Sequence, residues 1–240
     1  MKRISIFIIL AILTVIFITC QQISNKQDSI IERQIIESTG KLIEINFQDS
    51  NYLDLPLYAK DTVTKDGWSI KYFVKDDSTR YDDIYIQCSK GNLTGIFHGE
   101  NLLQYRRYFI PEFEKETNSY IYFTHGCATD CSAVLTFSKD STSRFNDYVS
   151  VVDYNLELEQ ILYITESCYT NEGEIYDLAL VDLKNNKIHK ITYNNICTAV
   201  FKPSCIDTVI FGKEQVIIKT RLRKSIEYEE YTPETRIIKL

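Results

Sequence analysis

The stretch Ile175-Tyr-Asp-Leu-Ala-Leu-Val-Asp-Leu-Lys-Asn-Asn-Lys-Ile-His-Lys-Ile-Thr-Tyr193 shows how this chain folds. Two short runs rich in apolar residues, Ile175–Leu183 and Lys187–Tyr193, lie on either side of a polar segment. Within that segment, Asn185 and Asn186 suit a tight turn that needs a positive φ. The pattern therefore predicts a β-hairpin.

The same alternation of short apolar runs and polar turns continues on both sides of this hairpin. The chain contains 17 Tyr and 12 Phe, and aromatic and β-branched residues favour strands. Further strands are predicted at Leu42–Phe47, Trp68–Val74, Asp83–Ser89, Leu93–Phe97, Tyr120–Thr124, Ser132–Ser138, Val149–Tyr154, Gln160–Thr165, Thr208–Phe211 and Gln215–Leu222. The sequence thus predicts a mainly β fold, an antiparallel meander with either propeller-like sheets or a β-sandwich.

One or two short helices accompany these strands in the prediction. Ser29-Ile30-Ile31-Glu32 forms a capping-box pattern, and Gly40 ends the apolar run that follows it. A second helix is predicted to start at Pro111, because proline suits the first helical position.

The N-terminal segment has the features of an export signal. Lys2 and Arg3 precede an apolar run, Ile4–Thr19, which is shorter than the roughly 20 residues that a membrane-spanning helix needs. Cys20 follows directly, and the polar segment Gln21–Asn25 comes next.

This arrangement resembles a bacterial lipoprotein signal peptide that ends at Cys20, although Phe17 and Ile18 depart from the family's usual residues. The resemblance implies removal of residues 1–19, lipidation of Cys20 and a lipid-anchored, exported protein at the cell membrane or the outer membrane. Residues 20–28 would then be a lipidated tether, and residues 29–240 would form a single β-rich domain.

Export changes how the other six cysteines are interpreted, because disulfides form in oxidising compartments. Two pairs are local in the sequence: Cys127 with Cys131, and Cys197 with Cys205. Cys88 and Cys168 remain and are predicted to join distant segments.

Charge argues against nucleic acid as a partner. Removal of Lys2 and Arg3 lowers Lys plus Arg from 27 to 25 against 33 acidic residues, which leaves a net charge of −8. A surface with this excess of acid does not suit a polyanion.

The sequence contains none of the common catalytic or nucleotide-binding motifs, so no catalytic residue, metal or cofactor is assigned. His125, Cys127 and Cys131 form the sharpest cluster; reduced, they would suit Cu(I) or Zn(II), but a plain disulfide is preferred. His98 follows a predicted strand and could serve a hydrolase, whereas His189 is interpreted as an exposed strand residue.

Two charged segments receive structural interpretations. Lys219, Arg221 and Arg223 alternate along one strand and, with Lys224, could contact lipid phosphates or an acidic partner; protection of a sheet edge is preferred. The acidic segment Asp76–Asp83 lacks the spacing of a calcium loop and is interpreted as a solvated hairpin tip.

The sequence therefore favours a non-catalytic binding or scaffold module at the cell envelope. Its partners would be the membrane, through the N-terminal lipid, and an envelope protein or glycan. Two alternatives stay open. One is an envelope hydrolase of glycan or peptide, and the other is a metal or redox handler that uses His125, Cys127 and Cys131.

Overall fold

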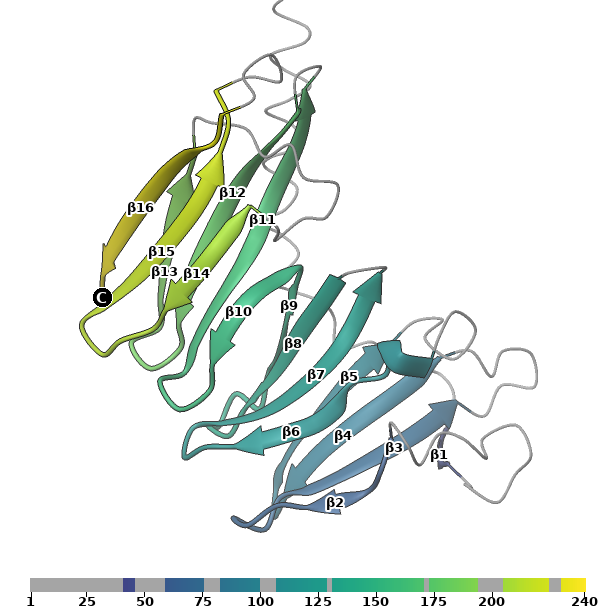
Figure 1. Cartoon of the computed structure of the whole chain (residues 1–240). Coiled ribbons are helices and arrows are strands. Elements are labelled where there is room, and N and C mark those ends of the chain that lie inside the picture. The colour runs from purple at the N-terminus through teal and green to yellow at the C-terminus, as the bar shows by residue number, and fades with distance from the viewer. Residues whose placement is uncertain are drawn as a thin grey trace, which may run out of the picture. The chain divides into compact units, whose positions relative to one another are not determined.

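The computed structural model describes residues 41–45, 59–75, 83–99, 107–128, 131–170, 173–193, 205–224 and 230–240. All of them belong to the unit formed by Gly40–Leu240. The strands of this unit form four antiparallel sheets that follow one another along the chain (Figure 1).

Most neighbouring strands in each sheet are also consecutive in the sequence. The first sheet contains β1 (Leu42–Glu44), β2 (Thr62–Val63), β3 (Ser69–Lys75), β4 (Ile84–Lys90) and β5 (Leu93–Gly99). The second contains β6 (Glu112–Glu116), β7 (Tyr120–Ala128), β8 (Cys131–Ser138) and β9 (Phe145–Val149). The third contains β10 (Val151–Asn155), β11 (Gln160–Thr170), β12 (Gly173–Asp182) and β13 (Lys187–Thr192). The fourth contains β14 (Ile206–Ile210), β15 (Gln215–Leu222) and β16 (Thr232–Lys239).

This architecture confirms the predicted mainly β fold. The described strands form four successive antiparallel sheets, whereas a β-sandwich would divide them between two sheets. The predicted hairpin is β12–β13, and Asn186 adopts the expected positive φ of 51°. Asp182 supports the turn, because its Oδ1 accepts a hydrogen bond from the Asn185 backbone N–H at 3.2 Å.

The helix predicted at Pro111 is wrong. Residues Glu112–Glu116 form strand β6, which pairs with β7, and Phe113 on this strand packs against the first hydrophobic core. Pairing with β7 and burial of Phe113 thus replace the helix that Pro111 suggested. The described residues contain only a three-residue 3-10 turn, η2 (Arg107–Phe109), just before β6. The helix predicted after Ser29 lies outside the described residues.

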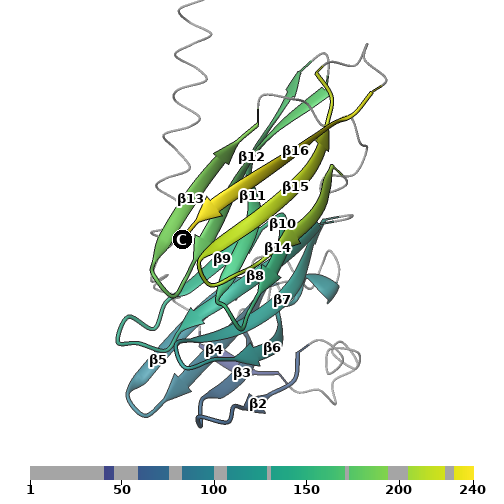
Figure 2. The same cartoon turned by 60° about the vertical axis from the view of Figure 1, so that its left-hand side comes forward.

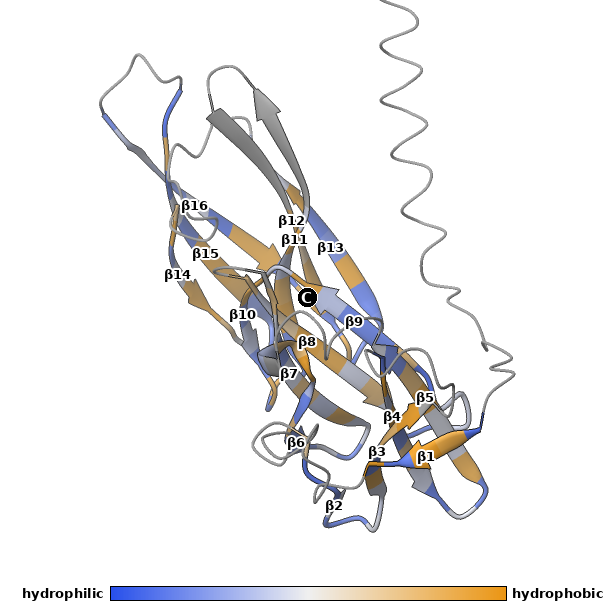
Figure 3. Ribbon diagram, turned by 90° about the vertical axis from the view of Figure 1, so that its right-hand side faces the viewer, coloured by the Kyte–Doolittle hydropathy of each residue, from blue (hydrophilic) through white to orange (hydrophobic). Residues whose placement is uncertain are grey.

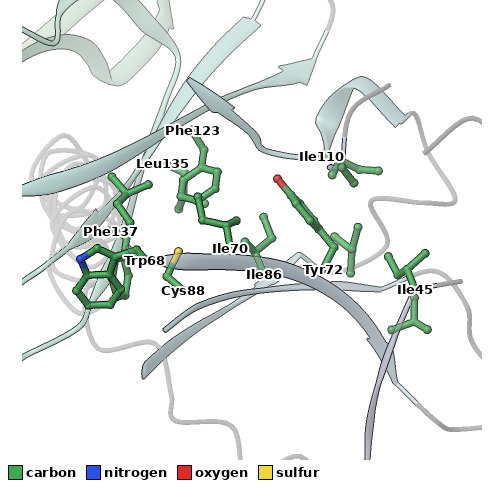
Figure 4. Close-up of a cluster of buried hydrophobic side chains, with 14 residues drawn as sticks. Ile45, Trp68, Ile70, Tyr72, Ile86, Cys88, Ile110, Phe123, Leu135 and Phe137 are labelled. Carbon is green, nitrogen blue, oxygen red and sulfur yellow. The ribbon is translucent and has the colours of Figure 1, made fainter. Parts of the chain in front are cut away.

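Three hydrophobic clusters join the sheets face to face. The first cluster holds Ile70 and Ile86 of the first sheet against Phe123 and Leu135 of the second (Figure 4). The opposite face of the second sheet packs on the third, and the other face of the third sheet packs on the fourth. Among the described residues, the second and third sheets are therefore covered on both faces, while the fourth sheet is covered on one.

Hydrogen bonds also link the first hairpin turn of each sheet to that of the next. Examples of these links are Thr64 Oγ1, which donates to Glu116 Oε1 (2.8 Å), Thr117 Oγ1, which donates to Glu159 Oε1 (2.6 Å), and Gln160 Nε2, which donates to the Gly212 carbonyl (3.0 Å). Each link crosses from one sheet to the following one, so the sheets are aligned at their turns as well as through their cores.

Candidate binding surface

The outer face of the fourth sheet carries exposed apolar residues on two of its three strands. On β15, Val216, Ile218, Thr220 and Leu222 are buried against the third sheet, and the residues between them point to the other face. β15 pairs with β14 on one side and β16 on the other, so it is the central strand (Figure 2).

This placement overturns the interpretation of Lys219 and Arg221 as protectors of a sheet edge. A central strand has no unpaired backbone edge for charges to guard. Both side chains are exposed on the outer face instead, and Arg221 Nε donates to Asp207 Oδ1 of β14 at 2.5 Å. Arg223 is half-buried, with its guanidinium 4.3 Å from the centre of the Tyr231 ring.

An apolar row crosses the same face. The strand register aligns Ile210 of β14, Ile217 of β15 and Ile237 of β16. Ile210 is 47% exposed and Ile237 is 57% exposed. Figure 3 shows hydrophobic segments in these strands, where Val216–Ile218 of β15 and Ile237–Ile238 of β16 lie. Sequence analysis missed this row, because Ile237 belongs to a strand that was not predicted.

The outer face of the first sheet differs. Tyr85 there is only 4% exposed, and its ring stacks on that of His98 with the centroids 4.5 Å apart. Lys71 on this face is paired with Glu44 at 2.7 Å. Lys71 and His98 on this face are thus paired with described carboxylates, whereas the fourth sheet presents Lys219 without a described acidic partner.

The predicted cluster of His125, Cys127 and Cys131 lies where the β7–β8 hairpin ends. The Cys127 and Cys131 sulfurs are at disulfide distance, and their Cα atoms are 5.2 Å apart. His125 faces oxygen acceptors on both sides: Gly126 O lies 2.8 Å from Nδ1, and Asp147 Oδ1 lies 3.1 Å from Nε2. Neither ring nitrogen is left to act as a base on a nucleophile.

His98 has one carboxylate partner. Its Nε2 lies 2.9 Å from Asp83 Oδ2, and both side chains are largely buried. Aspartate and histidine are two members of a hydrolase triad, but among the described residues no serine or cysteine is hydrogen-bonded to this ring. His189 is half-buried on β13 rather than exposed, and its Nε2 is buried.

The described side chains hold no group of three or more His, Cys, Asp or Glu that could bind a metal ion. The acidic segment Asp76–Asp83 lies outside the described residues except for Asp83. No described residue therefore supports the metal alternative while Cys127 and Cys131 are joined.

Cys88 corrects the predicted disulfide framework. It is a free thiol with no exposed surface, and its sulfur points into the first core (Figure 4). Burial raises the pKa of this thiol well above its ordinary value, so it stays protonated. Cys168 belongs to β11 of the third sheet, and the second sheet separates the two residues. The predicted Cys88–Cys168 bridge is therefore absent.

Cys205 is disulfide-bonded, and its partner lies outside the described side chains. The predicted partner, Cys197, is among the residues that the structure does not describe, as is Cys20. In the described part of the chain, no helix is long and apolar enough to cross a membrane.

No protein-family model, curated protein or solved structure matches this chain. The candidate surface therefore has to be interpreted from its own chemistry.

Proposed function

We propose that this chain is a cell-envelope lipoprotein whose β domain acts as a non-catalytic binding or scaffold module. Residues 1–19 would be removed on export, and the lipid on Cys20 would hold the domain at the membrane. The proposal for the anchor rests on the positive residues, the short apolar run and the position of Cys20.

The outer face of the fourth sheet supports the binding role. Ile210, Ile217 and Ile237 form a contiguous row, and they share this face with Lys219, which has no acidic partner among the described residues. A surface that mixes apolar and cationic groups suits recognition, whereas catalysis needs converging polar groups in a water-excluding cleft. The Asp147–His125 pair adds little to a catalytic role, since both nitrogens of that ring already face acceptors.

Fractionation of cells that express the full chain tests the anchor. We expect the wild type to stay in the membrane after an alkaline wash and to require detergent for release. Cys20→Ser should leave the membrane, because the variant cannot carry a lipid there. Recovery of unprocessed wild-type chain in the cytosol would contradict the proposal.

Photocrosslinking in intact cells tests the binding role. A crosslinking amino acid at Thr235, on the outer face of the fourth sheet, should give discrete lipid or protein adducts. The matched control is Thr94, an exposed threonine on β5 of the first sheet. Equal adducts from both positions, or none from Thr235, would argue against a binding face on the fourth sheet.

A further inference from the structure

The fourth sheet carries two kinds of group in register on its outer face. The apolar row of Ile210, Ile217 and Ile237 lies next to a polar row of Thr208, Lys219 and Thr235. Arg221 follows one step further along β15, opposite Pro233 of β16. A strip of isoleucine is therefore bordered on one side by Lys219, and Arg221, which is paired with Asp207, lies one step beyond it.

The size of this face limits what it can hold by itself. β15 and β16 contain eight residues each, so three strands cover a flat area of roughly 400 Å². A stable protein complex usually buries about 800 Å² on each partner. The face is too small for tight binding to a free protein, but it suffices for a chain that is already tethered beside its target.

The charge of the face selects an anionic target. Of the described acidic residues near these cations, Asp207 is paired with Arg221, and Glu234, opposite the buried Thr220, is paired with Arg236. A second copy of the chain offers a poor match, since Lys71 already neutralises Glu44 on the outer face of the first sheet. The mature chain would carry a net charge of −8, so the rest of its surface would turn away from an anionic membrane.

We infer that the outer face of the fourth sheet makes a second, reversible contact with an anionic phospholipid surface. Lys219 and Arg221 would meet the phosphates, and the isoleucine row would lie against the interface between headgroups and acyl chains. This inference rests on the proposed function, because the lipid on Cys20 keeps the domain close to the membrane. The contact would fix which way the tethered domain faces.

Lysine footprinting of the full lipidated chain tests this contact. The chain is bound to vesicles of phosphatidylcholine alone or with one-third phosphatidylglycerol, acylated briefly, and mapped by mass spectrometry. One cation near an anionic surface strengthens binding about fivefold, so acylation of Lys219 should fall at least about fivefold in the anionic vesicles. High salt should restore it, and the exposed Lys184 and Lys187 of the third sheet should not change.

Matched variants separate this face from general charge. In Lys219→Gln/Arg221→Gln, protection of the remaining Lys239 on the same face should be lost in anionic vesicles. Lys187→Gln/Lys190→Gln removes as much charge from β13 and should leave the protection of Lys239 intact.

Three outcomes would overturn the inference. The first is equal acylation of Lys219 in both vesicle types, and the second is protection of Lys219 in both types that does not change with salt. The third is protection of Lys219 that depends on the density of the chain on the vesicles and not on lipid charge, which would indicate contact between copies. If the chain floats with both vesicle types but Lys219 is not protected, only the proposed contact of the fourth sheet is contradicted. If the chain floats with neither vesicle type, the proposed lipid anchor is contradicted as well.

Discussion

The central strands β8 and β15 show how strand sequence reflects the number of neighbouring sheets. In β8, every residue from Ala133 to Ser138 is buried, because the second sheet packs against the first and the third. In β15, buried residues alternate with exposed or half-buried ones, because among the described elements the third sheet alone packs against it. A strand that is buried on both faces needs a continuous run of residues that can be buried. A strand that is buried on one face can carry charged residues at every second position.

The largest effect is expected at Phe137, a β8 residue with no exposed surface. Its ring packs edge-on against Trp68 of the first sheet, with the centroids 5.2 Å apart. Phe137→Ala should lower the free energy of unfolding by about 3–5 kcal/mol, since it leaves a cavity. The measurement is urea denaturation followed by tryptophan fluorescence.

The matched control for that change lies on the fourth sheet. Ile237→Thr keeps a β-branched side chain at an exposed position, so the free energy of unfolding should change by less than about 0.5 kcal/mol. If Phe137→Ala and Ile237→Thr lowered the free energy of unfolding by similar amounts, the outer face of the fourth sheet would have to be covered in the folded chain.

A somewhat smaller loss is expected at Lys139, just after β8. Its ammonium group is largely buried, lies 3.1 Å from Glu116 Oε1, and also contacts Asp66. Lys139→Met would leave the buried Glu116 carboxylate without its cation and should lower the free energy of unfolding by about 3 kcal/mol. Adding Glu116→Gln should recover part of the loss, whereas Lys219→Met on the fourth sheet should have almost no effect. Denaturation midpoints of the wild type, the three single variants Lys139→Met, Glu116→Gln and Lys219→Met, and the double variant check this, and full additivity of Lys139→Met and Glu116→Gln would contradict it.

The disulfide at the end of the second sheet ranks next. Cys127 and Cys131 close a loop with a sequence separation of 4, for which chain entropy gives about 2 kcal/mol of stabilisation. Cys127→Ser/Cys131→Ser should lower the free energy of unfolding by that amount. If urea denaturation finds the double variant as stable as the wild type, the pair does not stabilise the second sheet.

The smallest effect concerns pH and the turn of the first sheet. The Lys139 ammonium group holds the pKa of Asp66 below its ordinary value, mainly through a hydrogen bond. A lowered carboxyl pKa stabilises the fold above the pKa of the unfolded chain, about 3.9, and this contribution is lost as pH falls through the folded value. Asp66→Asn should therefore show a shallower loss of stability between pH 5 and pH 2 than the wild type, measured by denaturation at each pH. An identical pH profile would show that the pair does not contribute.

Much of the fold follows from the alternation of apolar residues. All the predicted strands correspond to observed ones, and the turn at Asn186 has the expected backbone conformation. The segment Val149–Tyr154 was predicted as one strand, but Ser150 adopts a positive φ of 60° and separates β9 from β10. A bend of this kind leaves no signal in hydropathy.

The strands that the sequence did not reveal are β2, β6, β9 and β16. β2 has only two residues, and β6 and β16 carry charged residues at alternate positions. The missing β16 had a direct consequence. Without it β15 looked like an edge strand, and the charges of Lys219 and Arg221 were then interpreted as edge protection.

The pairing of cysteines shows a second limit of sequence reasoning. A tight turn can be inferred for Cys127 and Cys131 because they are close in the chain. The separation of Cys88 from Cys168 depends on the second sheet lying between them, which is a property of sheet order and not of either local sequence. The Asp147–His125 pair is similar, since it spans 22 residues and depends on strand register.

Non-reducing mass spectrometry of the natively exported protein, taken from the membrane fraction, tests the central claim most directly. We predict a chain without residues 1–19, with acyl mass on Cys20, with Cys127 joined to Cys131, and with Cys88 open to alkylation only after unfolding. An intact leader with an unmodified Cys20 and free thiols at Cys127 and Cys131 would contradict the account.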